Sequence, residues 1–364
     1  PSGAGPHRGD RRSRPLTGRA GTDSRRLSGL VEQVGVGETG VRALDQAGVG
    51  HEQQDDVPWG HWSSEHVVAY IRAMPPIELQ VPSAHGITLT AYRWDPDGAP
   101  RGIVQLTHGM GEHLLRYEHL ATSLTHAGFV VIGQDHRGHG ASAQAGRWGA
   151  LGAGGWDELV RDIGRVSERA RTDHPGLPLV LLGHSMGSFA AQQYVLDHSD
   201  VLAGLVLTGT AVLDLLEPAL DLDQPLDLTA FNAPFAPART DYDWLSRDPA
   251  QVDAYVADER CGFGLTDVDG KQMFASARQV ADPERLSRLR ADLPVYLAVG
   301  EHDPVHGQLT LVHPLVQRLE QAGLTDVTLV VYPEARHEVF NETNRDEVVA
   351  ELLAWLDRVV PRTS

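Results

Sequence analysis

The chain has 364 residues, of which 41% are hydrophobic and 22% charged, an ordinary composition for a globular enzyme with a buried core. The formal net charge of −18 argues against nucleic acid or an anionic membrane surface as the main partner. Cys261 is the only cysteine, which excludes an intrachain disulfide, and we expect it to be a packed thiol. No apolar run approaches the ~18 residues of a membrane span, and no secretory signal is recognisable, so we expect a cytoplasmic protein.

The first 73 residues differ in composition from the rest. They are rich in Gly, Arg, Ser and Pro, and neither strand alternation nor a helical period persists there. We therefore expect a disordered extension over residues 1–73. Because Met74 directly precedes the first convincing strand, we hypothesise that it is the true start and that the extension is not native. Mass spectrometry of the native protein tests this, since peptides from residues 1–60 would contradict it.

From Ile77 onward, apolar strands alternate with amphipathic helices. Near-continuous apolar strands separated in this way predict a mostly parallel sheet that is buried on both faces. The expected strands are Ile77–Val81, Ile87–Trp94, Ile103–Thr107, Phe129–Gly133, Pro178–Leu182, Leu202–Thr208, Leu293–Gly300 and Val327–Tyr332. The expected helices are Tyr117–His126, Trp156–Thr172, Ser188–Asp197, Thr310–Ala322 and Arg345–Val360.

The alternation breaks between residues 209 and 283, a stretch rich in Leu, Pro and Asp with aromatic residues in short helical pieces. An insertion between two strands predicts a helical cap over the carboxyl edge of the sheet, before the strand Leu293–Gly300. We therefore divide the chain into a core of residues 74–208 and 284–364 and a cap of residues 209–283. Four cap residues are candidates for binding an apolar substrate, although each could simply pack on the sheet. They are Leu213, Leu216, Phe231 and Phe235.

The sequence Gly183-His184-Ser185-Met186-Gly187 follows an apolar strand and opens a helix. This is the context of a nucleophile elbow, in which the flanking glycines permit a sharp turn and keep neighbouring atoms away from the serine oxygen. The helix N-terminus would also favour negative charge that develops near Ser185. We therefore predict that Ser185 is a nucleophile rather than a capping serine.

A serine hydroxyl needs a base to remove its proton and an acid to orient that base. In α/β-hydrolases the three residues follow the order Ser, acid, His. Asp303 follows the strand after the cap and is the predicted acid, with Glu301 as the alternative; His337 lies in the loop before the last helix and is the predicted base. Three further histidines lie too near the acid's own strand to complete the triad, and we expect them at the surface. They are His302, His306 and His313.

An oxyanion hole requires backbone N–H groups aimed at the developing charge. The first predicted donor is Met186, the residue after the nucleophile. The second is Met110, in the loop after the strand Ile103–Thr107, because Gly109 and Gly111 let the chain approach the substrate oxygen. We expect His108 to brace this loop.

Two histidine pairs also invite interpretation as a metal site. They are His108 with His113 and His136 with His139, which could supply four nitrogen ligands. Their spacing does not place them on one helix face, and both segments are better explained as loops beside the elbow. We therefore predict no metal and no cofactor.

Several motifs, in order along the chain, resemble a known family. They are Thr107–His113, Asp135–Ser142, Gly183–Gly187 and His337–Glu338, with Ser246–Pro249 and Asp258–Gly264 in the cap. From about Ile77 to Val360 the chain resembles the monoacylglycerol lipase and lysophospholipase branch of α/β-hydrolases. The resemblance implies the α/β-hydrolase fold and hydrolysis of carboxylic esters of apolar acyl chains through an acyl-enzyme. Ser185 would attack the carbonyl, His337 would carry the proton and Asp303 would fix its tautomer.

Other activities of this fold stay open at this point. A peptidase of the proline-aminopeptidase type would need acidic cap residues for a substrate amine, and Asp221, Asp223 and Asp227 are available. A haloperoxidase or a carbon–carbon hydrolase could use the same elbow, whereas Ser185 counts against the dehalogenases and epoxide hydrolases, which use an aspartate. A non-catalytic binding protein of this fold usually lacks a triad member, and here all three candidates are present.

Overall fold

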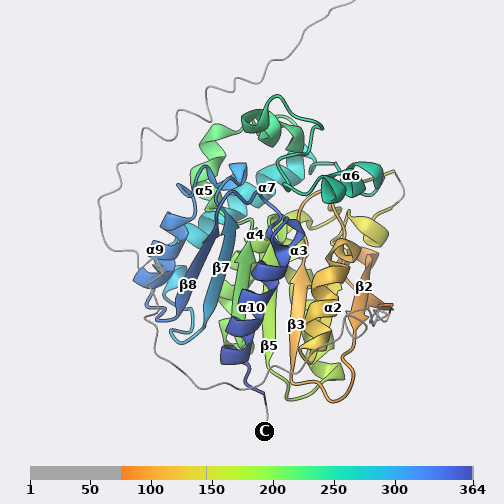
Figure 1. Cartoon of the computed structure of the whole chain (residues 1–364), viewed down its shortest axis with the longest axis vertical. Helices are drawn as coiled ribbons and strands as arrows, with labels where there is room; N and C mark the ends of the chain where they lie inside the picture. The colour runs from red at the N-terminus through yellow and green to blue at the C-terminus, as the bar shows by residue number, and fades with distance from the viewer. Residues whose placement is uncertain (1–74, 145, 363–364) are drawn as a thin grey trace, which may run out of the picture.

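The computed structural model describes residues 75–144 and 146–362, so the expectations on residues 1–73 and Met74 lie outside the described residues. Its centre is a sheet of eight strands in the order β1-β2-β4-β3-β5-β6-β7-β8 (Figure 1). β2 pairs antiparallel with β1 and β4, and every other pairing is parallel, which confirms the mostly parallel sheet. The strands are β1 (Ile77–Pro82), β2 (Thr88–Trp94), β3 (Gly102–Thr107), β4 (Phe129–Gln134), β5 (Leu179–His184), β6 (Gly204–Thr208), β7 (Val295–Gly300) and β8 (Val327–Tyr332).

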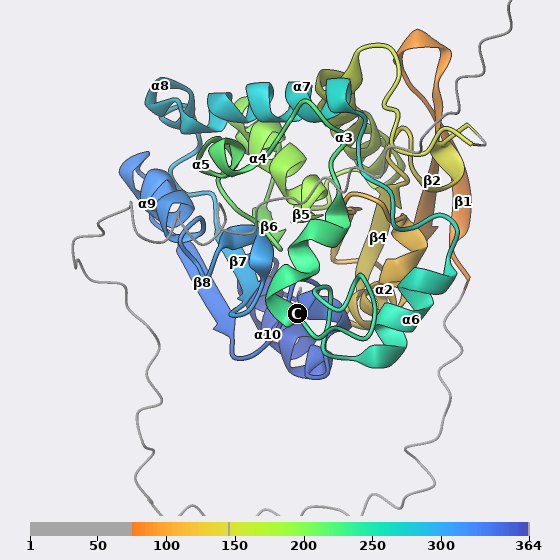
Figure 2. The ribbon, with the colours of Figure 1, turned by 90° about the horizontal axis from the view of Figure 1, so that it is seen from above.

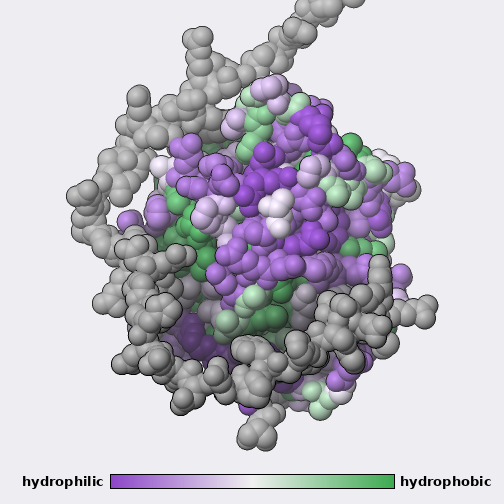
Figure 3. All heavy atoms as spheres, viewed as in Figure 1, coloured by the Kyte–Doolittle hydropathy of each residue, from purple (hydrophilic) through white to green (hydrophobic). Residues whose placement is uncertain are grey.

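Helices cover both faces of this sheet (Figure 1). Side chains alternate across a strand, so neighbouring strand residues enter two different hydrophobic clusters. Leu181 packs in the cluster of α3, α4 and α9, whereas Leu182 packs in the cluster of α2 and α10. The outward face in Figure 3 is mostly hydrophilic, with smaller hydrophobic areas, as expected where amphipathic helices cover a sheet. These helices are α2 (Glu118–His126), α3 (Gly155–Asp173), α4 (Met186–His198), α9 (His313–Gln321) and α10 (Arg345–Val359).

The insertion between β6 and β7 consists of helices and loops in the part of the chain that the structure describes. Seen from above, these helices extend across the molecule from α8 to α6 (Figure 2). We keep the name cap for residues 209–283. The helices of the insertion are α5 (Leu213–Leu216), η6 (Glu217–Ala219), η7 (Leu228–Phe235), α6 (Pro249–Ala257), α7 (Asp267–Ala277), η8 (Arg278–Ala281) and α8 (Pro283–Leu286).

A buried ion pair fixes the loop after β4 to α3. The Arg137 Nε donates to Asp162 Oδ2 at 2.8 Å, and both side chains are fully buried. The remaining guanidinium nitrogens donate to Ser83 Oγ at 2.9 Å and to the Ala153 carbonyl at 3.1 Å. Because each nitrogen has an oxygen partner, the buried charge is compensated.

Replacing Arg137 with methionine should lower the free energy of unfolding by about 3 kcal/mol, because Asp162 would lose its fully buried partner and keep Arg165, whose side chain is 28% exposed, as its ionic partner. Urea denaturation followed by circular dichroism measures this loss. The control is Arg161→Met, since Arg161 also pairs on α3 but its side chain is 63% exposed, and surface pairs contribute at most about 1 kcal/mol. Equal stabilities of the two variants would contradict the prediction.

Candidate active site

The turn from β5 to α4 holds Ser185 in a strained backbone conformation. Its φ of 50° and ψ of −122° are rare for a residue with a side chain, and such strain concentrates at functional sites. The turn is also crowded, because a methyl group on Gly183 would lie 2.6 Å from the Gly187 carbonyl oxygen, and one on Gly187 would overlap the Thr107 carbonyl. The two glycines of the motif therefore permit the close packing that this turn requires.

His337 and Asp303 meet at the carboxyl ends of β8 and β7. The distance from His337 Nδ1 to Asp303 Oδ2 is 2.8 Å, and the two residues are only 2% and 1% exposed. Asp303 Oδ1 also accepts the backbone N–H of Val305 at 2.9 Å, which fixes the carboxylate. Glu301, the alternative acid, is exposed and instead accepts the backbone N–H of Glu334. Of the two candidate acids, the structure therefore brings Asp303 to the histidine.

His337 and Asp303 shift each other's pKa values toward the charged forms. Burial alone would lower the pKa of His337, but the adjacent Asp303 carboxylate outweighs burial and raises that pKa above the usual 6.5. Burial would likewise raise the pKa of Asp303, yet His337 and His306 hold it at about 2. Asp303 is therefore an anion at neutral pH, and it stabilises an imidazolium on its partner.

His184 and Trp244 lie against the His337 ring. The centroid of the His337 ring is 4.7 Å from that of His184 and 4.8 Å from that of Trp244. His184 directly precedes Ser185, so the elbow adjoins the loop between β8 and α10 that carries His337, which we call the histidine loop. Burial, followed by the effect of His337, lowers the pKa of His184 to about 3, so this ring stays neutral. Trp244 comes from the cap, and its role was not predicted because nothing in the local sequence links it to His337.

The loop after β3 lies beside the elbow. A methyl group on Gly109 would be 3.2 Å from Ser185 Cβ. The Gly109 carbonyl is bonded to His108 Nδ1 at 2.8 Å, and in a trans peptide the following N–H points to the opposite side. The Met110 N–H is thereby turned away from His108. It donates to no backbone carbonyl among the described residues. His108 thus braces this loop, as expected.

The other predicted oxyanion donor, Met186, is the first residue of α4. The first N–H groups of a helix have no partner within the helix, and the helix dipole favours an anion at this end. Met186 itself is fully buried. Its N–H and that of Met110 therefore belong to the two segments that adjoin at Ser185.

One of the three histidines near Asp303 does not lie at the surface position expected for it. His306 is fully buried, because the short turn η9 (Pro304–His306) folds it back until Nε2 bonds to the Gly300 carbonyl at 2.8 Å. His306 Nε2 is also 3.9 Å from Asp303 Oδ2. The expectation was therefore wrong for His306, whereas His302 is exposed and His313 is half-buried.

The four histidines considered for a metal do not point to one place. The rings of His108, His136 and His139 cluster, with centroids 4.4 to 6.3 Å apart, whereas His113 Nε2 is bonded to Asp258 Oδ2 at 2.9 Å. His108 Nε2 is occupied as well, because it accepts the His136 backbone N–H.

A different trio has metal-ligand types close together. The candidate ligand atoms of His113, Asp258 and Cys261 lie within 4.8 Å of one another. Arg260 already donates to both oxygens of Asp258. Burial raises the pKa of Cys261 to about 12, which disfavours the thiolate that a metal binds. We therefore interpret the trio as a contact that ties the cap to the loop after β3.

The four predicted substrate residues occupy two kinds of position. Leu213 and Leu216 are buried in the main hydrophobic cluster, whereas Phe231 and Phe235 are half-buried at its edge. The Phe231 ring packs on Trp244, with centroids 5.2 Å apart, and Trp244 packs on His337. Phe231 is thus separated from the His337 ring by one side chain, and Phe235 packs against Arg336, the residue before His337.

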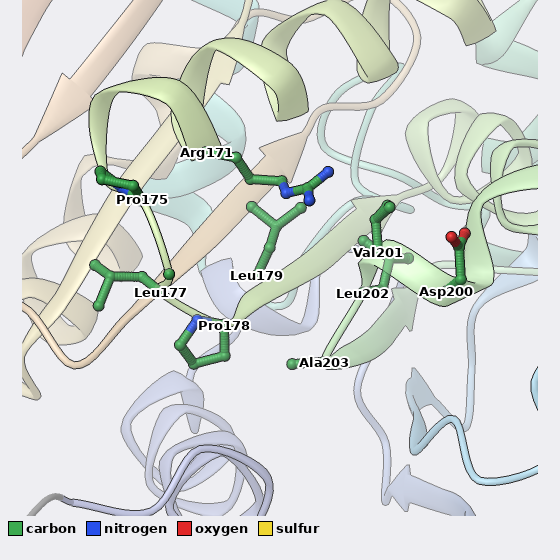
Figure 4. Close-up of a pocket in the computed structure, with 10 residues that line it drawn as sticks. Arg171, Pro175, Leu177, Pro178, Leu179, Asp200, Val201, Leu202 and Ala203 are labelled. Carbon is green, nitrogen blue, oxygen red and sulfur yellow. The ribbon is translucent and has the colours of Figure 1, made fainter.

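A shallow groove of about 600 Å³ opens at the other end of the sheet (Figure 4). It is lined by Pro178, Leu179 and Leu202 around the amino ends of β5 and β6, with Arg171 and Asp200 at its sides. Ser185 follows the carboxyl end of β5, so this groove is not part of the candidate site. Among the described helices, none has the length and apolarity that crossing a membrane requires.

The His337 side chain should titrate above pH 6.5, and Asp303→Asn should lower its pKa below that value, since the opposing charge is lost while burial remains. NMR of imidazole-labelled protein measures both titrations. The His184 ring serves as the internal control, because it should stay neutral through the same pH range. An unchanged His337 titration in the variant would contradict this account of the pair.

Comparison with known proteins places the chain in a family. The model of the family "Serine aminopeptidase, S33" matches residues 98–344. A monoacylglycerol lipase of Mycolicibacterium smegmatis is 34% identical over 287 residues, which cover 74% of this chain and 93% of that protein. The monoglyceride lipase of Homo sapiens is 30% identical, with coverage of 76% and 89%.

Solved structures agree with this assignment. A thermostable carboxyl esterase from Bacillus coagulans, solved with glycerol, superposes with a TM-score of 0.70 at 30% identity and covers 79% of this chain and 99% of that chain. The resemblance to α/β-hydrolases and the predicted fold are both confirmed. The chain belongs to the S33 serine aminopeptidase family, and it is a carboxylic ester hydrolase of the α/β-hydrolase fold.

Proposed function

We propose that this enzyme hydrolyses esters of apolar acyl chains, of the monoacylglycerol or lysophospholipid type, through a triad of Ser185, His337 and Asp303. The observation that carries the proposal is the buried 2.8 Å hydrogen bond between His337 and Asp303, beside an elbow that holds Ser185 at a positive φ. A nucleophile, a base and an acid that fixes the base are the parts that acyl transfer to serine requires.

In the first half of the reaction, Ser185 Oγ attacks the ester carbonyl carbon while His337 Nε2 takes the hydroxyl proton. The Asp303 carboxylate holds the proton on Nδ1, so Nε2 is free to accept. The carbonyl oxygen becomes an oxyanion beside the N–H groups of Met110 and Met186. The imidazolium then returns its proton to the leaving alcohol as the carbon–oxygen bond breaks, which leaves an acyl-Ser185.

The second half repeats these steps with water. His337 takes a proton from the attacking water, the hydroxide adds to the acyl carbon, and the same N–H groups receive the oxyanion. Collapse of this intermediate releases the fatty acid and returns the proton to Ser185 Oγ. Each proton that His337 accepts is given back within the same half-reaction, so the chemistry needs no metal or cofactor.

The nature of the substrate is inferred from the cap and from the relatives. Two matched relatives are named for monoacylglycerol and monoglyceride. Phe231 and Phe235 offer half-buried aromatic rings next to Trp244 and Arg336, the neighbours of the base. Aromatic and aliphatic linings favour an acyl chain over a polar substrate. Contact with lipid aggregates would then be transient, through the substrate rather than through a membrane span.

An aminopeptidase activity has weaker support in the cap. The three aspartates that could bind a substrate amine are all exposed. Asp223 is paired with Lys271 at 2.7 Å, and Asp227 accepts the Thr229 N–H as a helix cap. Asp221 accepts the backbone N–H of Asp223. Their hydrogen bonds thus serve the cap's own structure, which favours the ester substrate.

The Ser185→Ala variant should lose labelling by a fluorophosphonate probe and lower ester turnover by on the order of 10⁴–10⁶-fold. Gel fluorescence measures the labelling, and release of a chromogenic alcohol measures turnover. Ser287→Ala is the matched control, because Ser287 is an exposed serine in the loop after α8. Undiminished labelling of the Ser185 variant would show that another residue is the nucleophile.

Across a substrate panel, monoacylglycerols and lysophospholipids with long acyl chains should be hydrolysed at least tenfold more efficiently than aminoacyl amides. The reason is that the half-buried aromatic rings of the cap bury apolar surface of the acyl chain, at about 25 cal/mol per Å². Measured values of kcat/KM decide the comparison, with the Ser185→Ala protein as the background. Turnover of the amides alone would refute the proposed ester substrate.

A further inference from the structure

Arg116 lies between two buried carboxylates that come from distant parts of the chain. Its Nη1 donates to Glu112 Oε2 and to Glu338 Oε1, each at 2.6 Å, and its Nη2 donates to Glu338 Oε2 at 2.7 Å. The contact with Glu338 is thus bidentate, which fixes direction as well as distance. All three side chains are at least nine-tenths buried, so water does not weaken these bonds.

Glu112 connects Arg116 to the loop after β3 that bears Met110, which we call the oxyanion loop. Its Oε1 accepts the backbone N–H of Gly109 at 2.5 Å and the Tyr117 hydroxyl at 2.8 Å. Gly109 directly precedes Met110, the proposed oxyanion donor. Any movement of the Glu112 carboxylate therefore shifts the backbone that aims the Met110 N–H.

Glu338 connects Arg116 to His337, the proposed base. It is the residue after His337, and its backbone N–H donates to the Leu245 carbonyl of the cap at 2.8 Å. Its Oε2 also accepts from Asn341 Nδ2 at 2.9 Å. Because main chain and side chain are both held, the peptide that bears the His337 ring has little freedom.

The cap covers this network. The Arg116 guanidinium lies over the Tyr255 ring of α6, with its carbon 4.8 Å from the ring centroid. Tyr255 is itself buried. A cation on an aromatic face is stabilised most when it is shielded from water, so the cap helps to keep the guanidinium in place.

We propose that Arg116 is a positioning residue, which holds the oxyanion loop and the histidine loop at a fixed separation through Glu112 and Glu338. The inference rests on the proposed function, since it assigns Arg116 a role in the geometry of that site. Arg116 touches neither substrate nor reacting atoms. It acts by keeping the base and the oxyanion donor on opposite sides of one scissile carbonyl, where a misplacement of about 1 Å costs on the order of 100-fold in rate.

The network also contributes charge near His337, and this effect must be separated from positioning. The groups that face the imidazole are Asp303 at the start of η9, His184 from β5, and Glu338 and Glu112 from the network, with uncharged Trp244 on the cap side. Glu112 and Glu338 both raise the pKa of His337. Burial raises the pKa of Glu112; with both carboxylates ionised, the single guanidinium leaves the network with a net charge of −1.

The experiment compares Arg116→Met with the double variant Arg116→Met/Glu338→Gln. The single variant changes the network charge to −2, whereas the double variant keeps it at −1 but loses the connection. We expect both to lower kcat for a soluble short-chain ester by 10- to 100-fold, with KM within about threefold of the wild type. Arg116→Lys should fall between, because a lysine keeps the charge but cannot bind bidentately.

The control for loss of stability is Arg101→Met. Arg101 is similarly buried, lies over the Phe129 ring and donates to two carbonyls, but it precedes β3 at the opposite edge of the sheet. This variant should lose stability and keep kcat within about twofold. Thermal unfolding of every variant confirms that it is folded at the assay temperature.

A second readout separates this proposal from the proposed function. The proton between His337 Nδ1 and Asp303 gives a far-downfield NMR signal, which does not depend on any substrate. We expect it to shift or broaden in both Arg116 variants and to be unchanged in Arg101→Met. A double variant with wild-type kcat, or an unchanged signal in both Arg116 variants, would overturn the positioning role. A wild type that hydrolyses no ester would instead refute the proposed function.

Discussion

The hydrogen bond between His337 and Asp303 requires two loops to meet at 2.8 Å in a place that water does not reach. The parallel pairing of β7 with β8 satisfies this requirement, because neighbouring parallel strands end at the same edge of a sheet. The pairing even continues beyond the strands, since the N–H groups of Glu301 and His302 donate to carbonyls of Tyr332 and Ala335. The acid and base loops are thus extensions of one parallel ladder.

Burying a charged side chain costs free energy, and each buried charge of this site has a partner that offsets this cost. Asp303 has His337 and a backbone N–H, and Arg116 has two carboxylates. The neighbouring His184 ring, by contrast, stays neutral because burial lowers its pKa. The charge surplus around His337 is therefore negative, and it would favour the imidazolium that the proposed function requires when His337 accepts a proton.

Much of the fold, and the meeting of Asp303 with His337, could be predicted because the relevant signals are local. An apolar strand, a glycine-flanked serine and a helix stand within a few residues of one another, and the interruption before β7 is visible in composition alone. The contact of Arg116 with Glu338 spans 222 residues, and neither residue carries a local signal for it. His306 shows a subtler limit, since its burial depends on how one short turn folds back onto Gly300.

The cap contacts the proposed base as well as the candidate acyl-chain residues. Its Trp244 accepts the His337 backbone N–H at 3.4 Å and packs on the ring. The next segment is bound to the histidine loop as well, because Arg247 donates to the fully buried Glu342 at 2.8 Å. Phe231, the candidate acyl-chain contact, packs on the same Trp244. Under the proposed function, a smaller side chain at Phe231 would therefore loosen the packing of Trp244 on His337 while it enlarges the proposed acyl-chain site, which would couple chain-length preference to turnover through one indole ring.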